Sequence, residues 1–565
     1  MTAASPSRVA VVGFGPRGLS ILERLFALAA PHLDLEILIY EPATPGTGTH
    51  TCHQPAYLML NTVAGQATAF ADPSMVDGAP TLGGMSFLAW CQARGVRTPV
   101  LPGEPERAVL AADFLPRRVF GEYLQWSAQW LLDRVPARVS IELQPHRVTA
   151  VHPRGDRTLV QSEDGRVECV DLAFIATGHG APGAPRGDSG PALVAQPYPL
   201  PEAVAAIEPG ARVAVGGMGL ASIDIVASLT EGRAGTFSRA DDGRLVYRPS
   251  GDEPQLVLFS RNGWLPFARP ENPRTAPVAA RYALTTSRLA ELRAQTADGR
   301  LRISDVLRLI DEEIRGHDLT ASEQRAADRA LGLRLDERFA DAAAYDAEVR
   351  RQARWDLTEA RRGLGSSRFK DAMEALRDGR DVLRAAVAPP GMLGEDHRAF
   401  FDVIPGLANR AAVGPQIDRL EELLAVADAG IVSFATGPAP SIEPLARGWR
   451  LRSSRLEAPA DVTVDVLVNG YVDVPGVTVS REPVRASILS WSRPHRADPR
   501  FIDLDQDGFV IANDSAAPTT VCVVGPPAEG ANYYNNFVLW PGAPSGVLLA
   551  VDRAIRRTLL AALPV

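Results

Sequence analysis

Three glycines near the start of the chain have a spacing that suits binding of a diphosphate. They are Gly13, Gly15 and Gly18, in the segment GFGPRG, with Pro16 and Arg17 between the last two. A glycine allows a sharp turn at the first position, close approach of the backbone to phosphate at the second, and tight packing of a helix on a strand at the third. The free N–H groups at the start of the helix would then bind the diphosphate.

The residues around this turn predict the elements that position it. An apolar run, 8–12, precedes the turn, and apolar side chains recur at helical spacing over 19–25. A second apolar run, 35–40, ends in Glu41, whose carboxylate can accept hydrogen bonds from both hydroxyls of a ribose. Strand, turn, helix, strand and acid follow in the order of a dinucleotide-binding fold. A glycine turn in some other α/β protein is the alternative.

A second copy of this pattern begins with the apolar run 212–215. Gly217 and Gly219 lie in the turn that follows, 222–229 has helical spacing, and the next strand, 255–259, leads to Arg261 where the first copy has an acid. An arginine at this place can pair with a ribose 2′-phosphate, which favours NADPH over NADH. The alternative is that Arg261 is one of many surface arginines.

Residues 171–179, DLAFIATGH, lie between the two turns. This segment resembles the D-x-x-x-(L/F)-A-T-G-Y signature of flavin-dependent monooxygenases, particularly those that hydroxylate amines. Ile175 and His179 depart from that signature, and ATG segments also occur in other flavoproteins with two dinucleotide sites. The resemblance implies FAD at the first turn, with Thr177 and Gly178 among the cofactor-binding residues.

Two further segments supply residues expected near the flavin. Asn61 follows the apolar run 57–60 and could enter the flavin pocket. In flavoproteins of this kind the C-terminal segment commonly returns to the first domain, and Gly525, Gly530 and Asn532 fit such a return. A plain loop between strand and helix would explain the two glycines but not the polar residues beside them.

Composition limits the partners of the chain. It has 565 residues, 46% of them hydrophobic, and a formal net charge of −8 with acids and bases interspersed. This balance argues against nucleic acid or an anionic membrane and favours a small diffusing substrate. No apolar run has the length of a membrane span, and the four cysteines have neither metal-ligand nor CxxC spacing. We therefore expect a cytoplasmic protein with reduced thiols and no bound metal. The sequence does not decide whether the protein forms a homo-oligomer.

The length and pattern predict an α/β protein with two Rossmann-like domains and a mostly helical insertion. We expect an FAD-binding domain over 1–204, an NADPH-binding domain over 205–278 and the insertion over 279–430, and a return to the FAD-binding domain over 431–565. The insertion would shape the substrate pocket.

Three cations in or near the insertion could bind the carboxylates of an amino acid substrate. They are Arg368, Lys370 and Arg410. Lys370 is the only lysine in a chain rich in arginine, and its compact charge could be selected for that role or retained by chance. Arg410 could equally be a surface or interdomain contact.

The whole chain resembles a bacterial family of FAD/NAD(P)-binding proteins. The segments that carry the resemblance are GFGPRGLSILERL, RRVFGEYL, GLASIDIVASLTEGRAG, SSRFKDAMEALRDGRDVLR and GPPAEG. One activity associated with the wider group is the nitrosuccinate synthase reaction, oxidation of L-aspartate at its amino group. The resemblance therefore implies a monooxygenase that uses FAD, NADPH and O2 on a small acidic amine through a flavin hydroperoxide, with no catalytic side chain assigned.

Other functions are weaker alternatives. The F-x-G-x-x-x-H-x-x-x-W fingerprint of Baeyer–Villiger enzymes, which oxidise ketones, is missing before the second glycine turn. No CxxC follows the first turn, which disfavours a disulfide reductase. A nucleotide-binding regulatory protein without turnover is the alternative from outside the enzymes.

Overall fold

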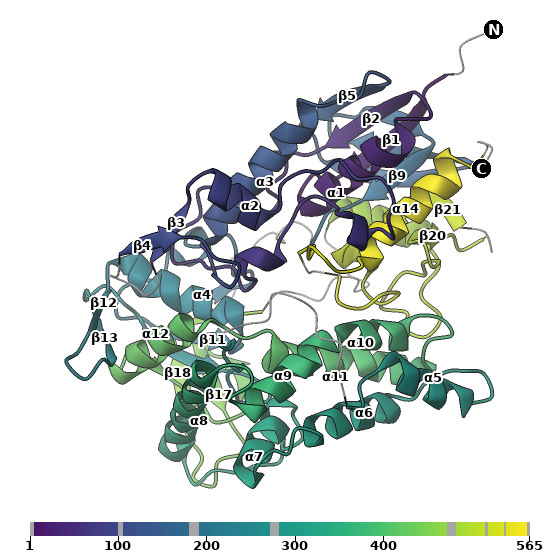
Figure 1. Cartoon of the computed structure of the whole chain (residues 1–565). Helices are drawn as coiled ribbons and strands as arrows, with labels where there is room; N and C mark the ends of the chain where they lie inside the picture. Colours follow the sequence, from purple (N-terminus) through teal and green to yellow (C-terminus); the bar gives the residue numbers. More distant parts are fainter. Residues whose placement is uncertain are drawn as a thin grey trace.

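Two mainly parallel β-sheets and a group of helices make up the computed structural model (Figure 1). It describes residues 5–99, 105–179, 191–271, 282–471, 482–514, 518–535 and 538–561. The predicted α/β fold, with two Rossmann-like domains and a mostly helical region, is confirmed. Within the described ranges, no helix is long and apolar enough to cross a membrane.

The first sheet has six strands in the order β20-β21-β9-β1-β2-β5. In that order the strands are Phe509–Ile511, Pro518–Val523, Leu172–Ile175, Ser7–Val12, Leu35–Tyr40 and Val139–Gln144. Neighbouring strands pair in parallel, except that β20 is antiparallel to β21. Since β21 pairs with β9, the C-terminal part of the chain completes the sheet that the N-terminal part begins.

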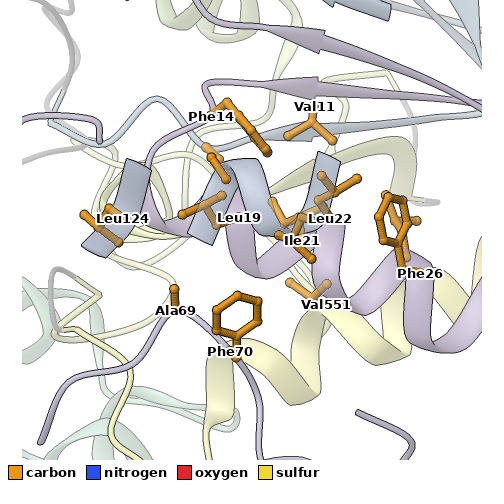
Figure 2. Close-up of a cluster of buried hydrophobic side chains, with 14 of the residues drawn as sticks. Val11, Phe14, Leu19, Ile21, Leu22, Phe26, Ala69, Phe70, Leu124 and Val551 are labelled. Atoms are coloured by element: carbon orange, nitrogen blue, oxygen red, sulfur yellow. The ribbon is translucent and has the colours of Figure 1, made fainter. Parts of the chain in front are cut away.

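Helix α1 (Pro16–Arg24) is enclosed by other elements of this domain. Its side chains Leu19 and Leu22 pack in a cluster with Val551 of α14 (Gly546–Leu559), and α3 (Arg117–Leu132) contributes to the same cluster (Figure 2). Arg24 is fully buried and donates to Asp552 of α14 at 2.6 Å. The first glycine turn therefore leads into a helix that is fixed on several sides.

The second sheet has five parallel strands in the order β10-β19-β11-β14-β15. In that order they are Leu193–Val194, Val466–Asn469, Arg212–Gly216, Gln255–Phe259 and Val432–Ser433. Its core includes Ile225 of α4 (Leu220–Leu229), Val349 of α8 (Ala342–Arg362) and Leu423 of α12 (Ile417–Asp428). Two helices from the predicted insertion thus complete the second domain.

Three short strands pair across the predicted domain boundaries. β10 lies in the segment 1–204, and β15 and β19 lie in the segment 431–565. We predicted that both segments belong to the FAD-binding domain, but all three strands pair in the second sheet. The chain rejoins the first sheet through β20 and β21, after α13 (Pro483–Trp491). The three strands have only two, two and four residues, too few for an alternating pattern to identify their sheet.

A further group of helices lies in the lower part of Figure 1 and shares a separate apolar core. They are α5 (Thr286–Ala294), α6 (Ile303–Arg315), α7 (Ala321–Ala330), α9 (Arg368–Asp378), α10 (Arg380–Val387) and α11 (Gly394–Ala412). This core also contains Phe501 and Tyr533 from the C-terminal segment. The helical region therefore packs against the part of the chain that returns to the first domain.

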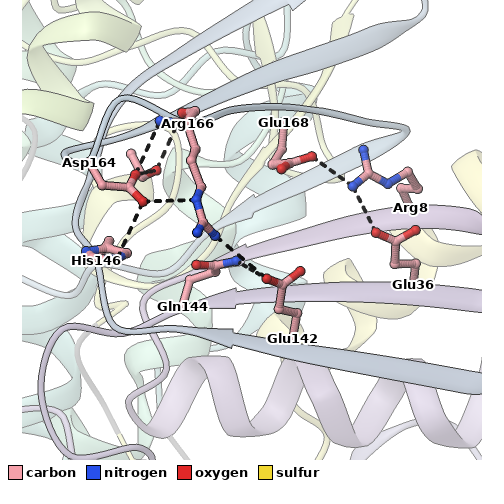
Figure 3. Close-up of polar contacts among 9 residues, drawn as sticks. Arg8, Glu36, Glu142, Gln144, His146, Asp164, Arg166 and Glu168 are labelled. Carbon is pink, nitrogen blue, oxygen red and sulfur yellow. Dashed lines mark hydrogen bonds and ion pairs between the residues drawn. The ribbon is translucent and has the colours of Figure 1, made fainter.

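Four smaller sheets of two or three strands accompany the two main sheets in the described residues. A three-stranded sheet of β6 (Val148–Arg154), β7 (Arg157–Ser162) and β8 (Val167–Val170) is tied to the first sheet by Arg8, which donates to Glu36 and Glu168 (Figure 3). The others are β3 (Arg97–Pro99) with β4 (Glu106–Ala108), β12 (Thr236–Arg239) with β13 (Leu245–Arg248), and β16 (Ser441–Pro444), β17 (Trp449–Arg452) and β18 (Asp461–Val464). Helix α2 (Phe87–Ala93) lies beside α3.

Candidate cofactor and substrate site

The three glycines of the first turn are at positions where a side chain would be crowded. Gly13 has φ +91°, and a Cβ on it would lie 2.7 Å from the Ala176 carbonyl oxygen. A Cβ on Gly15 would lie 3.1 Å from the Gly48 Cα, and one on Gly18 would overlap the Gly13 carbonyl. Helix α1 begins directly after Gly15, so its free N–H groups face this cradle. The geometry fits a dinucleotide diphosphate.

Glu41 lies at the end of β2, beside this turn. Its carboxylate accepts hydrogen bonds from the backbone N–H of Phe14 at 2.8 Å and of Ala43 at 3.0 Å. Each carboxylate oxygen can accept a second bond, so the acid remains able to bind ribose hydroxyls while it fixes the turn.

Thr177 and Gly178 follow β9 at the same edge of the sheet. The Thr177 hydroxyl donates to Glu482 at 3.3 Å, and Arg485 donates to the Gly178 carbonyl. Glu482 and Arg485 form an ion pair of 2.9 Å at the start of α13. Sequence reasoning missed these two partners, because they lie about three hundred residues from the turn that they hold.

The second glycine turn has one crowded and one open glycine. Gly217 has φ +121°, and a Cβ on it would lie 2.7 Å from the Gly470 carbonyl oxygen. Gly219 precedes α4, and no heavy atom of the described residues, apart from its chain neighbours, comes within 4 Å of the place where its Cβ would be. A phosphate can therefore approach the N-terminus of α4 at Gly219.

Arg261 is exposed just beyond β14, and its carbonyl accepts a hydrogen bond from Arg455 at 2.9 Å. Arg410 lies close enough to Arg261 for the two charges to repel, and burial together with this repulsion lowers the pKa of Arg410 to about 10. We predicted Arg410 as a substrate clamp, but the structure brings it near the residue predicted to bind the NADPH 2′-phosphate.

The C-terminal segment reaches the first glycine turn. Gly525 has φ +83°, and a Cβ there would lie 3.2 Å from the Arg17 Cγ. Gly530 has φ +100°, and a Cβ on it would overlap the Phe501 ring. Asn532 is exposed, whereas Asn535 is buried and its amide donates to Glu529 at 2.9 Å. Asn535 is one of the polar residues beside these glycines that a plain loop did not explain, although only Asn532 was predicted to bind the cofactor.

Asn61 is half-buried. It follows Leu60, whose carbonyl accepts a hydrogen bond from the side chain of Gln416, just before α12. The Thr62 hydroxyl donates to the Asn61 side-chain oxygen at 3.5 Å, and no contact among the described residues assigns Asn61 a role.

Lys370 and Arg368 lie on α9 but point to different surroundings. Lys370 is 2% exposed, and its ammonium lies 2.5 Å from Asp356 and 2.7 Å from the Ala268 carbonyl oxygen. Burial lowers the pKa of Lys370 and raises that of Asp356. Arg368 is exposed and donates to the Asp318 carbonyl at 3.3 Å. The structure therefore does not bring Arg368, Lys370 and Arg410 together as one clamp.

A different set of arginines lies at the junction of helices and C-terminal segment. Arg377, Arg380 and Arg384 come from the end of α9 and from α10, and Arg17 comes from α1. Of these, sequence reasoning singled out only Arg17. The spacing of three and four residues, which would place the other three on one face of a continuous helix, was the available signal.

Comparison with known proteins places the chain in a family. Residues 10–180 match a family described as FAD-NAD(P)-binding. An L-aspartate N-monooxygenase (nitrosuccinate-forming) from Streptomyces davaonensis is 31% identical over 84% of this chain and 83% of its own length. The same enzyme from Streptomyces cremeus is 32% identical over 88% and 82%. Nitrosuccinic acid synthase from Aspergillus oryzae is 27% identical over 98% and 93%.

Among solved structures, an ornithine hydroxylase from Pseudomonas aeruginosa aligns over 99% of this chain and 100% of its own length, with 12% identity and a TM-score of 0.48. Similarity at this level supports no conclusion about activity. The sequence relatives show the family, because identity above 30% to two of them extends over more than four fifths of both chains. The chain belongs to the FAD- and NAD(P)-binding family of flavin-dependent N-hydroxylating monooxygenases.

Proposed function

We propose that the protein oxygenates the amino group of L-aspartate to form nitrosuccinate, with FAD, NADPH and O2. The observation that carries the proposal is the identity of about 30% to three relatives named for aspartate oxygenation or nitrosuccinate formation. The two glycine turns supply the cofactor sites that such a reaction needs.

FAD would lie in the first turn, with its diphosphate at the start of α1 and its ribose at Glu41. Bound FAD, once reduced by NADPH, supplies the oxygen chemistry, for which the protein needs no nucleophile of its own. Gly217 and Gly219 would admit the NADPH diphosphate, and Arg261 the 2′-phosphate. The protein's own task is to exclude water and to present an unprotonated amine.

The first test measures NADPH oxidation by the FAD-loaded protein in air, with and without L-aspartate, while nitrosuccinate is assayed. Aspartate-dependent oxidation coupled to that product supports the proposal. Oxidation that yields only hydrogen peroxide, whether or not aspartate is present, rejects aspartate as substrate. Cyclohexanone in parallel tests the ketone alternative, because a lactone product would assign the reaction to the Baeyer–Villiger class.

A further inference from the structure

The loop after β14 leads from the second glycine turn into the helical region. Its first residue, Ser260, has its hydroxyl 3.4 Å from the Met218 sulfur in that turn. Arg261, the residue predicted to bind the NADPH 2′-phosphate, comes next and is exposed, whereas residues 262–270 are all buried. Because Arg261 is joined directly to this buried stretch, the position of the stretch sets the position of the arginine relative to the turn.

The other end of the loop reaches the interface with the first domain. Arg269 forms an ion pair of 3.0 Å with Glu374 of α9, and the same carboxylate contacts Arg377 at 3.1 Å. Arg377 in turn donates to Gln66, a residue of the first domain, at 2.7 Å. The loop therefore connects the predicted NADPH site with the place where the helices meet the first domain.

Lys370 and Asp356 hold this loop at Ala268. The backbone N–H of Ala268 donates to Asp356 at 2.7 Å, and its carbonyl accepts from the Lys370 ammonium at 2.7 Å. The ammonium also donates to Asp356 at 2.5 Å, and the side chains of Lys370 and Asp356 are 1% and 3% exposed. Since Asp356 comes from α8 and Lys370 from α9, two helices fix both polar backbone groups of one loop residue.

The space around Lys370 fits a lysine better than an arginine. Its ammonium lies 5.6 Å and 5.8 Å from the centres of the Phe267 and Phe369 rings. A cavity lined by Phe267 and Asp356 has only about 10 Å³, which is room for one water molecule at most. An arginine would bring a larger, planar guanidinium with five donors into this space. The only lysine of the chain therefore lies where a compact cation is needed.

We propose that Lys370 and Asp356 are positioning residues for NADPH. By fixing Ala268 they set the buried stretch of the loop, and through it the place of Arg261 beside the second glycine turn. The inference rests on the proposed function, in which Arg261 binds the 2′-phosphate, and it adds α8 and α9 to the elements on which donor preference depends. A pair that only stabilises the fold is the alternative, and it predicts no change in the preference between NADPH and NADH.

The probes are NADP+ and NAD+, whose affinities for the oxidised, FAD-loaded protein are measured by calorimetry together with FAD content and melting temperature. We expect Lys370→Arg, which keeps the charge but adds volume, to weaken NADP+ binding by about tenfold, as loss of one charged hydrogen bond predicts. NAD+ binding should change little, because the glycine turn is intact. FAD content should equal that of wild type.

The double variant Lys370→Met, Asp356→Asn separates positioning from stability. It leaves no buried charge, so its melting temperature should approach that of wild type. The Ala268 carbonyl still loses its donor, so the lowered preference for NADP+ should persist. This variant also decides the question if Lys370→Arg does not fold. Arg419→Gln is the matched control, because it breaks a largely buried ion pair with Glu422 in the same domain, and its contacts among the described residues do not include the loop.

A ratio of NADP+ to NAD+ affinity equal to that of wild type, in Lys370→Arg or in the double variant, would overturn the inference. Equal weakening of both nucleotides would overturn it too, by assigning the pair to general stability. A wild-type protein without preference for NADP+ would remove Arg261 from the site and the inference with it. Loss of the preference in these variants, in a protein that forms no nitrosuccinate, would keep the positioning role and reject the proposed substrate.

Discussion

Arg261 is an exposed residue just after β14, at the edge of the sheet where the second glycine turn lies. If it binds the 2′-phosphate, Arg261→Ala removes a charged hydrogen bond worth roughly 1.5–3 kcal/mol. We expect the KM for NADPH to rise at least tenfold while that for NADH changes little, measured by steady-state oxidation of both donors. Arg244→Ala, which changes an exposed arginine of the same domain, is the control. An unchanged preference between donors would contradict the assignment.

We expect His397 to make folding stability depend on pH. It is 1% exposed, donates to the Gly530 carbonyl, and has its pKa lowered to about 4 by burial and by the neighbouring His495. The unfolded chain binds this proton near pH 6.5 and the folded chain does not, so stability is lost as pH falls from about 6.5 toward 4. Between pH 7 and 5 the loss should be about 2 kcal/mol from this group.

The measurement is urea unfolding at several pH values for wild type and His397→Gln. Glutamine can still donate to Gly530 but does not titrate, so the variant should lose about 2 kcal/mol less than wild type between pH 7 and 5. Parallel curves for the two proteins would show that His397 is not the titrating group.

Two helices are joined by the ion pair of Lys370 and Asp356. Asp356 lies on α8 and Lys370 on α9, and both side chains are at most 3% exposed. Lys370→Met leaves a buried carboxylate without its counter-charge, which should cost about 3–5 kcal/mol in urea unfolding. The double variant Lys370→Met, Asp356→Asn should recover much of this loss, because no net charge stays buried. If Lys370→Met is as stable as wild type, the ion pair does not stabilise the fold, and Lys370 becomes a candidate for substrate binding again.

The sequence could predict those elements whose residue pattern lies within one short segment. Both glycine turns, with their preceding strands and following helices, occupy fewer than twenty residues each. The glycines of the first turn and Gly217 have the tight packing that the pattern implies, whereas Gly219 is open. Contacts between distant elements left no such signal. Lys370 was notable for its type, yet its partner Asp356 could not be identified, since only the packing of α8 on α9 brings the two charges together.

At the scale of the molecule, the path of the chain was the least predictable feature. Short strands such as β10 and β15 have two residues each and join the second sheet because their neighbours leave an unpaired edge there. The arginine group was equally hidden, because its members come from α1, α9 and α10 and meet only where the helical region packs on the first domain.

The two domains are themselves linked by a buried ion pair. Arg117 of α3 contacts Asp224 of α4 at 2.6 Å, and the Tyr198 hydroxyl donates to the same carboxylate at 2.6 Å. Asp224→Ala would leave a guanidinium that is only 17% exposed without its counter-charge, at a cost of about 3 kcal/mol. Because the partners belong to different domains, we expect faster amide exchange at the starts of both α3 and α4, measured by mass spectrometry.

Asp34→Ala is the matched control for this variant. It removes the partner of Arg138 from an ion pair in which both side chains are at least half exposed, so the loss should stay below about 1 kcal/mol. If Asp224→Ala accelerates exchange in only one of the two helices, the pair stabilises that helix alone. Acceleration in both, with FAD retained, would identify the contact as one that holds the domain of the second sheet in place against the domain of the first sheet.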